Sequence, residues 1–312
     1  MTARFYLFAM PPNLPFCSRR ACASGVPLLG TATEASTWLL IEVPAAWGQK
    51  ALAESSLPKS VKELLLKWEV QEASRRIQLI RREANTFDTS GRITIFVAHV
   101  SANPPELYRF YFEDYTDLLE LNLEDQTSDK PLHDGFSRHG KPLFMTCANG
   151  RRDACCAKWG REMANAIAEV AGAAAWQTTH LGGHRFAPTH LVLPHGSQYG
   201  WLRPEEAASL VESHRKGHLY RIDRYRGHVG FIPPVQAAAA FLRNKVDCRD
   251  LDTLAFVEVI KEGSNTWWVR FRLNQNIYKV QVTQEEDATI PLSCGDDPKP
   301  TMRFVPKRWQ LA

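Results

Sequence analysis

The sequence predicts a protein that combines α/β and α+β structure in three regions. Short apolar or alternating segments, typical of strands, occur along most of the chain and are interleaved with segments of helical periodicity. The composition, 44% hydrophobic and 23% charged, is that of an ordinary globular protein, and 312 residues suffice for two or three domains. We therefore expect an N-terminal α+β region over 1–130, an α/β region over 131–232 and a small C-terminal α+β domain over 233–312.

Composition and charge exclude several classes of protein. No apolar run reaches the length of about 18 residues that is needed to span a bilayer, so we expect no membrane insertion. The net charge of +4 is too small to indicate nucleic acid as a partner. Seven cysteines in a chain of this length do not form a disulfide framework. The first 33 residues lack Asp and Glu, as transit peptides do, but we expect an irregular arm on a cytoplasmic protein.

The N-terminal region is expected to contain one helix and four strands. Pro58 favours the first turn of a helix over Ser56–Ala73, and Val61 and Leu65 recur on one face of it. Acidic and polar residues over Glu120–Asp129 are typical of a linker. The strands are predicted at Trp38–Val43, Arg76–Arg82, Ile93–Val100 and Leu107–Asp114.

The central region alternates strands and helices with short connections. Its second helix, Pro204–Arg215, opens with Pro204 and two acidic residues, which suit a helix N-terminus. This order is typical of a small thioredoxin-like α/β domain. The other elements are predicted as strand Lys141–Cys147, helix Ala157–Ala171, and strands Ala174–Thr179, Leu191–Leu193 and Tyr199–Leu202.

The C-terminal region is expected to begin with a helix that runs from Pro233 through Val246. Asn274-Gln275-Asn276 then predicts a turn between two strands. The strands are predicted at Leu254–Lys261, Thr266–Leu273 and Ile277–Val282, with an edge strand at Phe304–Gln310.

Soft metal ligands gather in two loops of the central region. Cys147 and the pair Cys155-Cys156 occupy one loop, and His180 and His184 occupy the next, each after a predicted strand. If the two strands are neighbours in one sheet, the loops emerge side by side. Two thiolates and two imidazoles suit either a tetrahedral zinc ion or an iron–sulfur cluster.

The spacing of the cysteines favours the larger cofactor. Zinc sites usually take cysteine pairs separated by two to four residues, whereas Cys147 lies eight or nine residues before the next cysteines. Neutral imidazoles in place of two thiolates raise the potential of a two-iron cluster from about −400 mV towards a range of about −150 to +300 mV. Gly182 and Gly183 would allow positive φ angles in the tight histidine loop.

The same residues carry a resemblance to a known family. Cys147 and Cys155-Cys156, followed by His180-Leu-Gly-Gly-His184-Arg-Phe-Ala-Pro, resemble the sucrase/ferredoxin-like family, whose relatives are thioredoxin-like [2Fe-2S] ferredoxins. The segments Pro27–Ala32 and Trp38–Gly48 are similar to the N-terminal part of that family. The resemblance covers roughly residues 17–245.

This resemblance implies a thioredoxin-like fold that holds one [2Fe-2S] cluster through Cys147, Cys156, His180 and His184. It favours Cys156 over Cys155, because family members can lack a cysteine at the latter position. The usual thioredoxin-like ferredoxin has Cys-x3-Cys where this chain has His-x3-His, so the ligand set is Rieske-like. The family name mentions sucrase, but no convincing pair of catalytic carboxylates is found, and we expect an electron carrier rather than an enzyme.

Reduction of the cluster is expected to be coupled to proton uptake at the histidine ligands. The expected partners are redox proteins, namely a reductase and an acceptor. The alternative is a zinc-stabilised Cys2His2 binding module without redox activity. Cys155 is expected to pack inward or to serve as a spare ligand. The cysteines without a partner at ligand spacing are interpreted as structural: Cys17, Cys22, Cys248 and Cys294.

Overall fold

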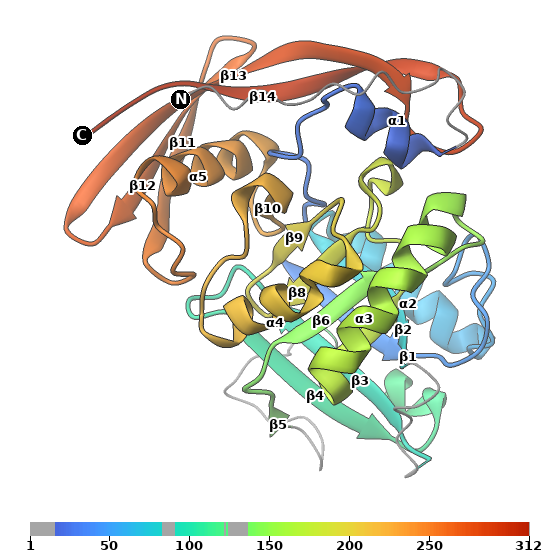
Figure 1. Ribbon diagram of the computed structural model, residues 1–312. Helices are drawn as coiled ribbons and strands as arrows, with labels where there is room; N and C mark the ends of the chain where they lie inside the picture. Colours follow the sequence, from blue (N-terminus) through green and yellow to red (C-terminus); the bar gives the residue numbers. More distant parts are fainter. Residues whose placement is uncertain (1–15, 83–90, 122, 124–136, 312) are drawn as a thin grey trace.

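A computed structural model describes residues 16–82, 91–121, 123 and 137–311 of the chain (Figure 1). The α-helices are α1 (Cys17–Ala23), α2 (Lys59–Gln71), α3 (Arg161–Ala171), α4 (Ala207–Arg215) and α5 (Pro233–Lys245). The strands of the first half are β1 (Thr37–Glu42), β2 (Arg75–Arg81), β3 (Ile93–His99), β4 (Glu106–Phe112) and β5 (Ser137–Arg138). The central strands are β6 (Leu143–Cys147), β7 (Ala175–Thr178), β8 (His190–Leu193), β9 (Ser197–Tyr199) and β10 (Tyr225–His228). The last four are β11 (Leu254–Glu262), β12 (Thr266–Leu273), β13 (Asn276–Pro291) and β14 (Pro298–Leu311).

One sheet runs through both the N-terminal and the central region. Its ten strands lie in the order β10-β9-β8-β6-β7-β2-β1-β3-β4-β5. The two regions join where β2 pairs with β7, through Ile80 opposite Thr178 and Arg81 opposite Gln177. The expected boundary at 130/131 and most of the expected linker lie outside the described residues. The division at this point stays a prediction, but the two regions share a single sheet.

The sheet curls, and its inner face is filled by side chains from both halves. Trp38 and Leu40 of β1 belong to the same buried cluster as Met145 and Cys147 of β6. Helix α2 covers the outer face of the N-terminal half, where Val61 packs with residues of β1 to β4. Helices α3 and α4 cover the outer face of the central half. This arrangement confirms the predicted mixed α/β and α+β class and is compatible with a thioredoxin-like fold.

The C-terminal region forms a second, smaller sheet. Strands β11, β12, β13 and β14 are all antiparallel and lie in this order, with α5 packed against them. The predicted edge strand at Phe304–Gln310 is confirmed as part of β14. Strands β13 and β14 form a long hairpin that reaches away from α5 and past α1 (Figure 1).

Two local expectations are wrong. Residues Cys17–Ala23 form helix α1 rather than part of an irregular arm, because Ala21 has an apolar neighbourhood to pack into beside Phe186. The strand expected at Tyr199–Leu202 is Ser197–Tyr199 instead, and Trp201 adopts a positive φ of 52° that ends the extended backbone. Within the described residues, no helix is long and apolar enough to cross a membrane.

Candidate metal centre

The two predicted cysteine ligands lie at the end of a strand and at the start of a helix. Cys147 is the last residue of β6, and Cys156 begins the π-helical turn Cys156–Gly160 that leads into α3. Both side chains are fully buried. Gly160 allows the helix to approach the strand closely, since a Cβ atom there would lie 2.0 Å from the Cys147 carbonyl oxygen. The turn therefore brings Cys156 against Cys147.

The histidine loop emerges at the same edge of the sheet as the cysteine loop. Strands β6 and β7 are parallel neighbours with Cys147 opposite Thr178, which is the condition for the two loops to emerge side by side. His180 follows β7 by two residues. The ligand atoms of Cys147, Cys156 and His180 all lie within 4.8 Å of one another. Three of the four predicted ligands are thus gathered in one place.

His184 lies beside this group rather than within it. Its ring centroid is 4.8 Å from that of His180, with the two planes tilted by 32°. His184 is buried and His180 is half-buried. In both rings Nδ1 is buried and has no hydrogen-bond partner within the part of the chain that the structure describes. A buried nitrogen without a hydrogen-bond partner destabilises the folded protein unless something binds it. Each ring therefore presents a nitrogen that is available to ligate a metal.

The thiols of the group hydrogen-bond to each other. Cys156 donates to Cys147, and this bond holds the pKa of the Cys147 thiol well below its usual value and raises that of Cys156. A thiolate is the form that binds a metal. The protein therefore favours the ligand form of Cys147 even though the side chain is fully buried.

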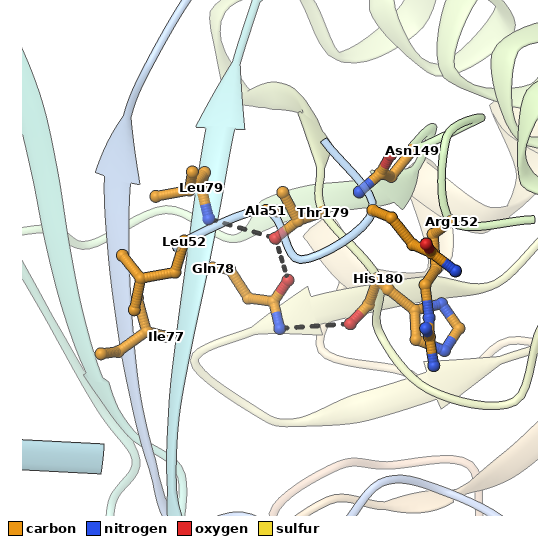
Figure 2. Close-up of a pocket in the computed structure, with 10 residues that line it drawn as sticks. Ala51, Leu52, Ile77, Gln78, Leu79, Asn149, Arg152, Thr179 and His180 are labelled. Atoms are coloured by element: carbon orange, nitrogen blue, oxygen red, sulfur yellow. Dashed lines mark hydrogen bonds between the residues drawn. The ribbon is translucent and has the colours of Figure 1, made fainter. Parts of the chain in front are cut away.

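Gln78 of β2 anchors the beginning of the histidine loop (Figure 2). Its Nε2 donates to the His180 carbonyl at 3.4 Å, and its Oε1 accepts from the Thr179 hydroxyl at 2.7 Å. The Thr179 hydroxyl in turn accepts from the Leu79 amide at 3.2 Å. A strand of the N-terminal region therefore positions a predicted ligand of the central region.

Three further side chains hold the middle of the loop. The Leu181 carbonyl accepts from the Thr33 hydroxyl at 2.6 Å and from Gln198 Nε2 at 2.9 Å. The Gly182 carbonyl accepts from Arg226 Nη1 at 2.9 Å. Sequence reasoning missed these supports because none of them stands at ligand spacing. Gln198 stands between Ser197 and Tyr199, and Arg226 between Tyr225 and Gly227, so no local pattern of apolar and polar residues marks them.

The two loop glycines take the conformation that the sequence predicts. Gly182 has φ of +82° and Gly183 has φ of +69°. A Cβ atom on Gly182 would lie 2.2 Å from Thr33 Oγ1, and one on Gly183 would lie 2.7 Å from Arg226 Nη2. The glycines therefore serve both the left-handed backbone and the close approach of the supporting side chains.

Positive charge surrounds the histidine loop on two sides. Burial lowers the pKa of Arg226 to about 9, so the guanidinium is still a cation at neutral pH. Its Nη2 also donates to the Thr31 carbonyl. On the solvent side, the exposed Arg152 lines a pocket of about 170 Å³ (Figure 2). The half-buried His180 lines the same pocket. An anionic group at the loop would be stabilised by both charges.

Comparison with known families matches the sucrase/ferredoxin-like family model to residues 28–227. The chain belongs to the sucrase/ferredoxin-like family. The matched segment covers the ten-stranded sheet except for the last residue of β10, and it contains Cys147, Cys156, His180 and His184. Comparison with curated proteins finds no match.

A second group of cysteines in this sucrase/ferredoxin-like chain lies beyond the reach of ligand spacing. Cys17 and Cys294 both lie against Cys155 and Asp153, so their partners are distant in the sequence. Their separation of 277 residues hides this contact from any spacing rule. Cys155 turns into this second group, whereas Cys156 faces Cys147. A hydrogen bond with Cys17 lowers the pKa of the Cys155 thiol to about 7.

Proposed function

We propose that this sucrase/ferredoxin-like protein is a one-electron carrier with a [2Fe-2S] cluster held by Cys147, Cys156, His180 and His184. The observation that carries the proposal is the convergence of ligand atoms: those of Cys147, Cys156 and His180 lie within 4.8 Å of one another. The ring of His184 stands next to that of His180.

The donor atoms suit such a cluster. The two cysteines are buried and the Nδ1 atoms of both histidines have no protein partner in the described chain. Thiolates on one iron and imidazoles on the other form the Rieske ligand set. A bound cluster of this kind supplies a one-electron redox centre with a potential of about −150 to +300 mV.

The protein's own residues would set the position and the charge of the site. Hydrogen bonds from Gln78, Thr33 and Arg226 to successive carbonyls of the loop fix where the two imidazoles stand. The buried Arg226 cation would favour the more negative, reduced state. Burial of both thiols would exclude water from the iron that they ligate.

The proposal includes proton uptake on reduction at the histidines. With Nδ1 as the ligating atom, Nε2 is left to carry a proton, and one proton would enter for one electron. The His184 Nε2 atom lies 3.8 Å from Asp153 Oδ2, a carboxylate that would stabilise a proton there. A reduction potential that stays constant between pH 6 and pH 9 would contradict this part of the proposal.

The redox partners are proposed to approach the exposed arginines of the cysteine loop. Arg151 and Arg152 are both exposed, and Arg152 shares its pocket with His180. Positive side chains on the rim of a site attract an acidic partner surface and speed its association. A reductase and an acceptor with acidic docking surfaces would fit this position.

Iron and sulfide analysis of anaerobically purified protein tests the proposal. We expect equal amounts of iron and acid-labile sulfide, two of each per chain, and visible absorption from the cluster. Cys147→Ser should lose most of both, whereas Cys248→Ser, at a half-buried cysteine outside the two ligand groups, should keep them. Iron-free, colourless wild-type protein would overturn the proposal.

The alternative function is a zinc-stabilised binding module without redox activity. The observation in its favour is that ligand atoms within 4.8 Å of one another also suit a single ion. Metal analysis separates the two functions. One zinc ion ligated by two sulfur and two nitrogen atoms, in protein without iron, would support this module.

A further inference from the structure

A second group of metal-ligating side chains lies apart from the proposed cluster site. Cys17 opens α1, Cys294 lies in the turn between β13 and β14, and Cys155 immediately precedes the Cys156–Gly160 turn. With Asp153 they place four ligand atoms within 4.8 Å of one another. These residues come from three distant parts of the sequence, and the proposed function does not use them as ligands.

The three sulfur atoms form a triangle of the right size for one tetrahedral zinc ion. The Sγ atoms of Cys17 and Cys155 are 3.5 Å apart, those of Cys155 and Cys294 are 3.3 Å apart, and those of Cys294 and Cys17 are 3.7 Å apart. A tetrahedral ion with zinc–sulfur bonds of 2.3 Å requires sulfur separations of about 3.8 Å. The triangle needs to expand only slightly to accept zinc.

Asp153 occupies the fourth corner. Its Oδ1 lies 3.9 Å from Cys17 Sγ and accepts from the Cys155 amide at 2.8 Å. Its Oδ2 accepts from the Cys294 amide and from the Ser293 hydroxyl, both at 2.9 Å. The carboxylate is therefore held in place against two of the three cysteines. A ligating carboxylate is typically oriented by such hydrogen bonds.

The surroundings suit an anionic metal–thiolate centre. Phe16 and Trp159 pack over Cys17 and Cys155 in a small apolar cluster, with their rings 5.9 Å apart. Arg185 is close enough to interact electrostatically with Cys17, and its Nε atom is buried without a hydrogen-bond partner in the described chain. Without a cation, three thiols gathered round a carboxylate have only weak hydrogen bonds to gain.

We propose that Cys17, Cys155, Cys294 and Asp153 bind one zinc ion. Four protein ligands leave no open coordination position, so the role of the ion is structural. It would fasten α1 and the β13–β14 hairpin to the loop that carries Cys156. Cys17 and Cys294 lie outside the family match over 28–227, whereas Asp153 and Cys155 lie within it, so the site joins the family segment to the two ends of the chain.

Metal analysis of the full-length protein tests the site. We expect one zinc per chain, and we expect Cys294→Ser to lower the zinc content at least fivefold while iron and sulfide stay unchanged. Cys22→Ser is the matched control, because Cys22 lies on the same helix as Cys17 but is exposed. If Cys294→Ser does not fold, Cys294→Asp keeps a ligating side chain and should retain zinc.

Zinc X-ray absorption identifies which residues bind the ion. Three sulfur atoms and one oxygen atom support the proposed site, whereas two sulfur and two nitrogen atoms would place zinc at the histidines and overturn it. Zinc that is absent, or unchanged in Cys294→Ser, would also overturn it. So would a mass that is two daltons low and reveals a disulfide. Iron analysis judges the proposed electron carrier separately, because its ligands are different residues.

Discussion

The Nε2 atom of His184 lies 3.8 Å from Oδ2 of Asp153, and this contact joins the two groups of ligands. His184 belongs to the predicted cluster site, whereas Asp153 belongs to the group of Cys17, Cys155 and Cys294. The carboxylate is fixed by the amides of Cys155 and Cys294. The orientation of His184 therefore depends on how the C-terminal hairpin and the cysteine loop meet.

Exchange of a histidine ligand for cysteine should keep the cluster and change its potential. His180→Cys adds a thiolate and so makes the centre more negative, which disfavours reduction. We expect the midpoint potential to fall by a few hundred mV, towards about −400 mV. Protein-film voltammetry measures the shift. The exposed His218, exchanged for cysteine as a control, should leave the potential unchanged.

Gly182→Ala should weaken the support of the histidine loop. The residue has φ of +82°, and the new methyl group would lie 2.2 Å from Thr33 Oγ1, which holds the Leu181 carbonyl. The strained backbone alone costs about 1–3 kcal/mol. We expect a lower urea midpoint and faster loss of visible absorption than in Gly217→Ala, where φ is +74° but no atom lies within 4 Å. Equal effects of the two substitutions would contradict the proposed role of Thr33.

Stability should fall in mild acid because several histidines are buried in neutral form. Burial lowers the pKa of His195 to about 4. The two nitrogens of its ring form hydrogen bonds with the Ser197 hydroxyl and the Leu251 carbonyl. The unfolded chain takes up this proton near pH 6.5, so the stabilisation is complete above that pH and is lost as the pH falls towards 4. His195 alone should account for about 2 kcal/mol between pH 7.5 and pH 5.

Urea unfolding at the two pH values measures this contribution. His195→Gln should show a smaller loss of stability between pH 7.5 and pH 5 than the wild type, because glutamine does not take up a proton. The Arg243 cation further opposes the protonation of His195, whereas the Asp250 carboxylate favours it. The exposed His218→Gln is the control and should retain the full pH dependence. An unchanged slope in His195→Gln would rule out this source of acid sensitivity.

Charge reversal at Arg152 should slow reduction by an anionic reductant. Arg152 is exposed and lines the pocket that His180 also lines. We expect Arg152→Glu to lower the rate of reduction by dithionite several-fold at low ionic strength and the difference to shrink at high salt. Stopped-flow absorption measures the rate. Lys59→Glu, an exposed charge reversal on α2 away from this pocket, should have little effect.

Local patterns predicted that the cysteine and histidine loops converge, but not the long-range contacts that support them. Periodicity located β6, β7 and α3, and the parallel pairing of β6 with β7 follows from the short strand–helix–strand connection. This pairing brings the Cys147 and His180 loops to one edge. The two-residue junction of β2 with β7 has no signal in the sequence. Gln78 does stand out as a polar residue between Ile77 and Leu79, but the sequence does not reveal that its partner is the His180 carbonyl.

The group of Cys17, Cys155 and Cys294 shows the same limit of local patterns. Spacing rules detect ligands that lie within one or two loops, whereas this group is assembled by α1 and by a hairpin from the far end of the chain. The sequence pattern therefore predicts a structural role for Cys17 and Cys294 and no partner at ligand spacing. Helix α1 forms because Ala21 packs beside Phe186, which local periodicity could not reveal in so short a segment.

Pulsed EPR of the reduced, anaerobically purified protein reports both the proposed cluster and its ligands in one experiment. We expect a signal from a reduced [2Fe-2S] cluster with hyperfine coupling to two histidine nitrogens, and only one such coupling in His184→Cys. A signal without nitrogen coupling, or a protein that has no signal and holds zinc at Cys147 and Cys156, would contradict the proposed cluster.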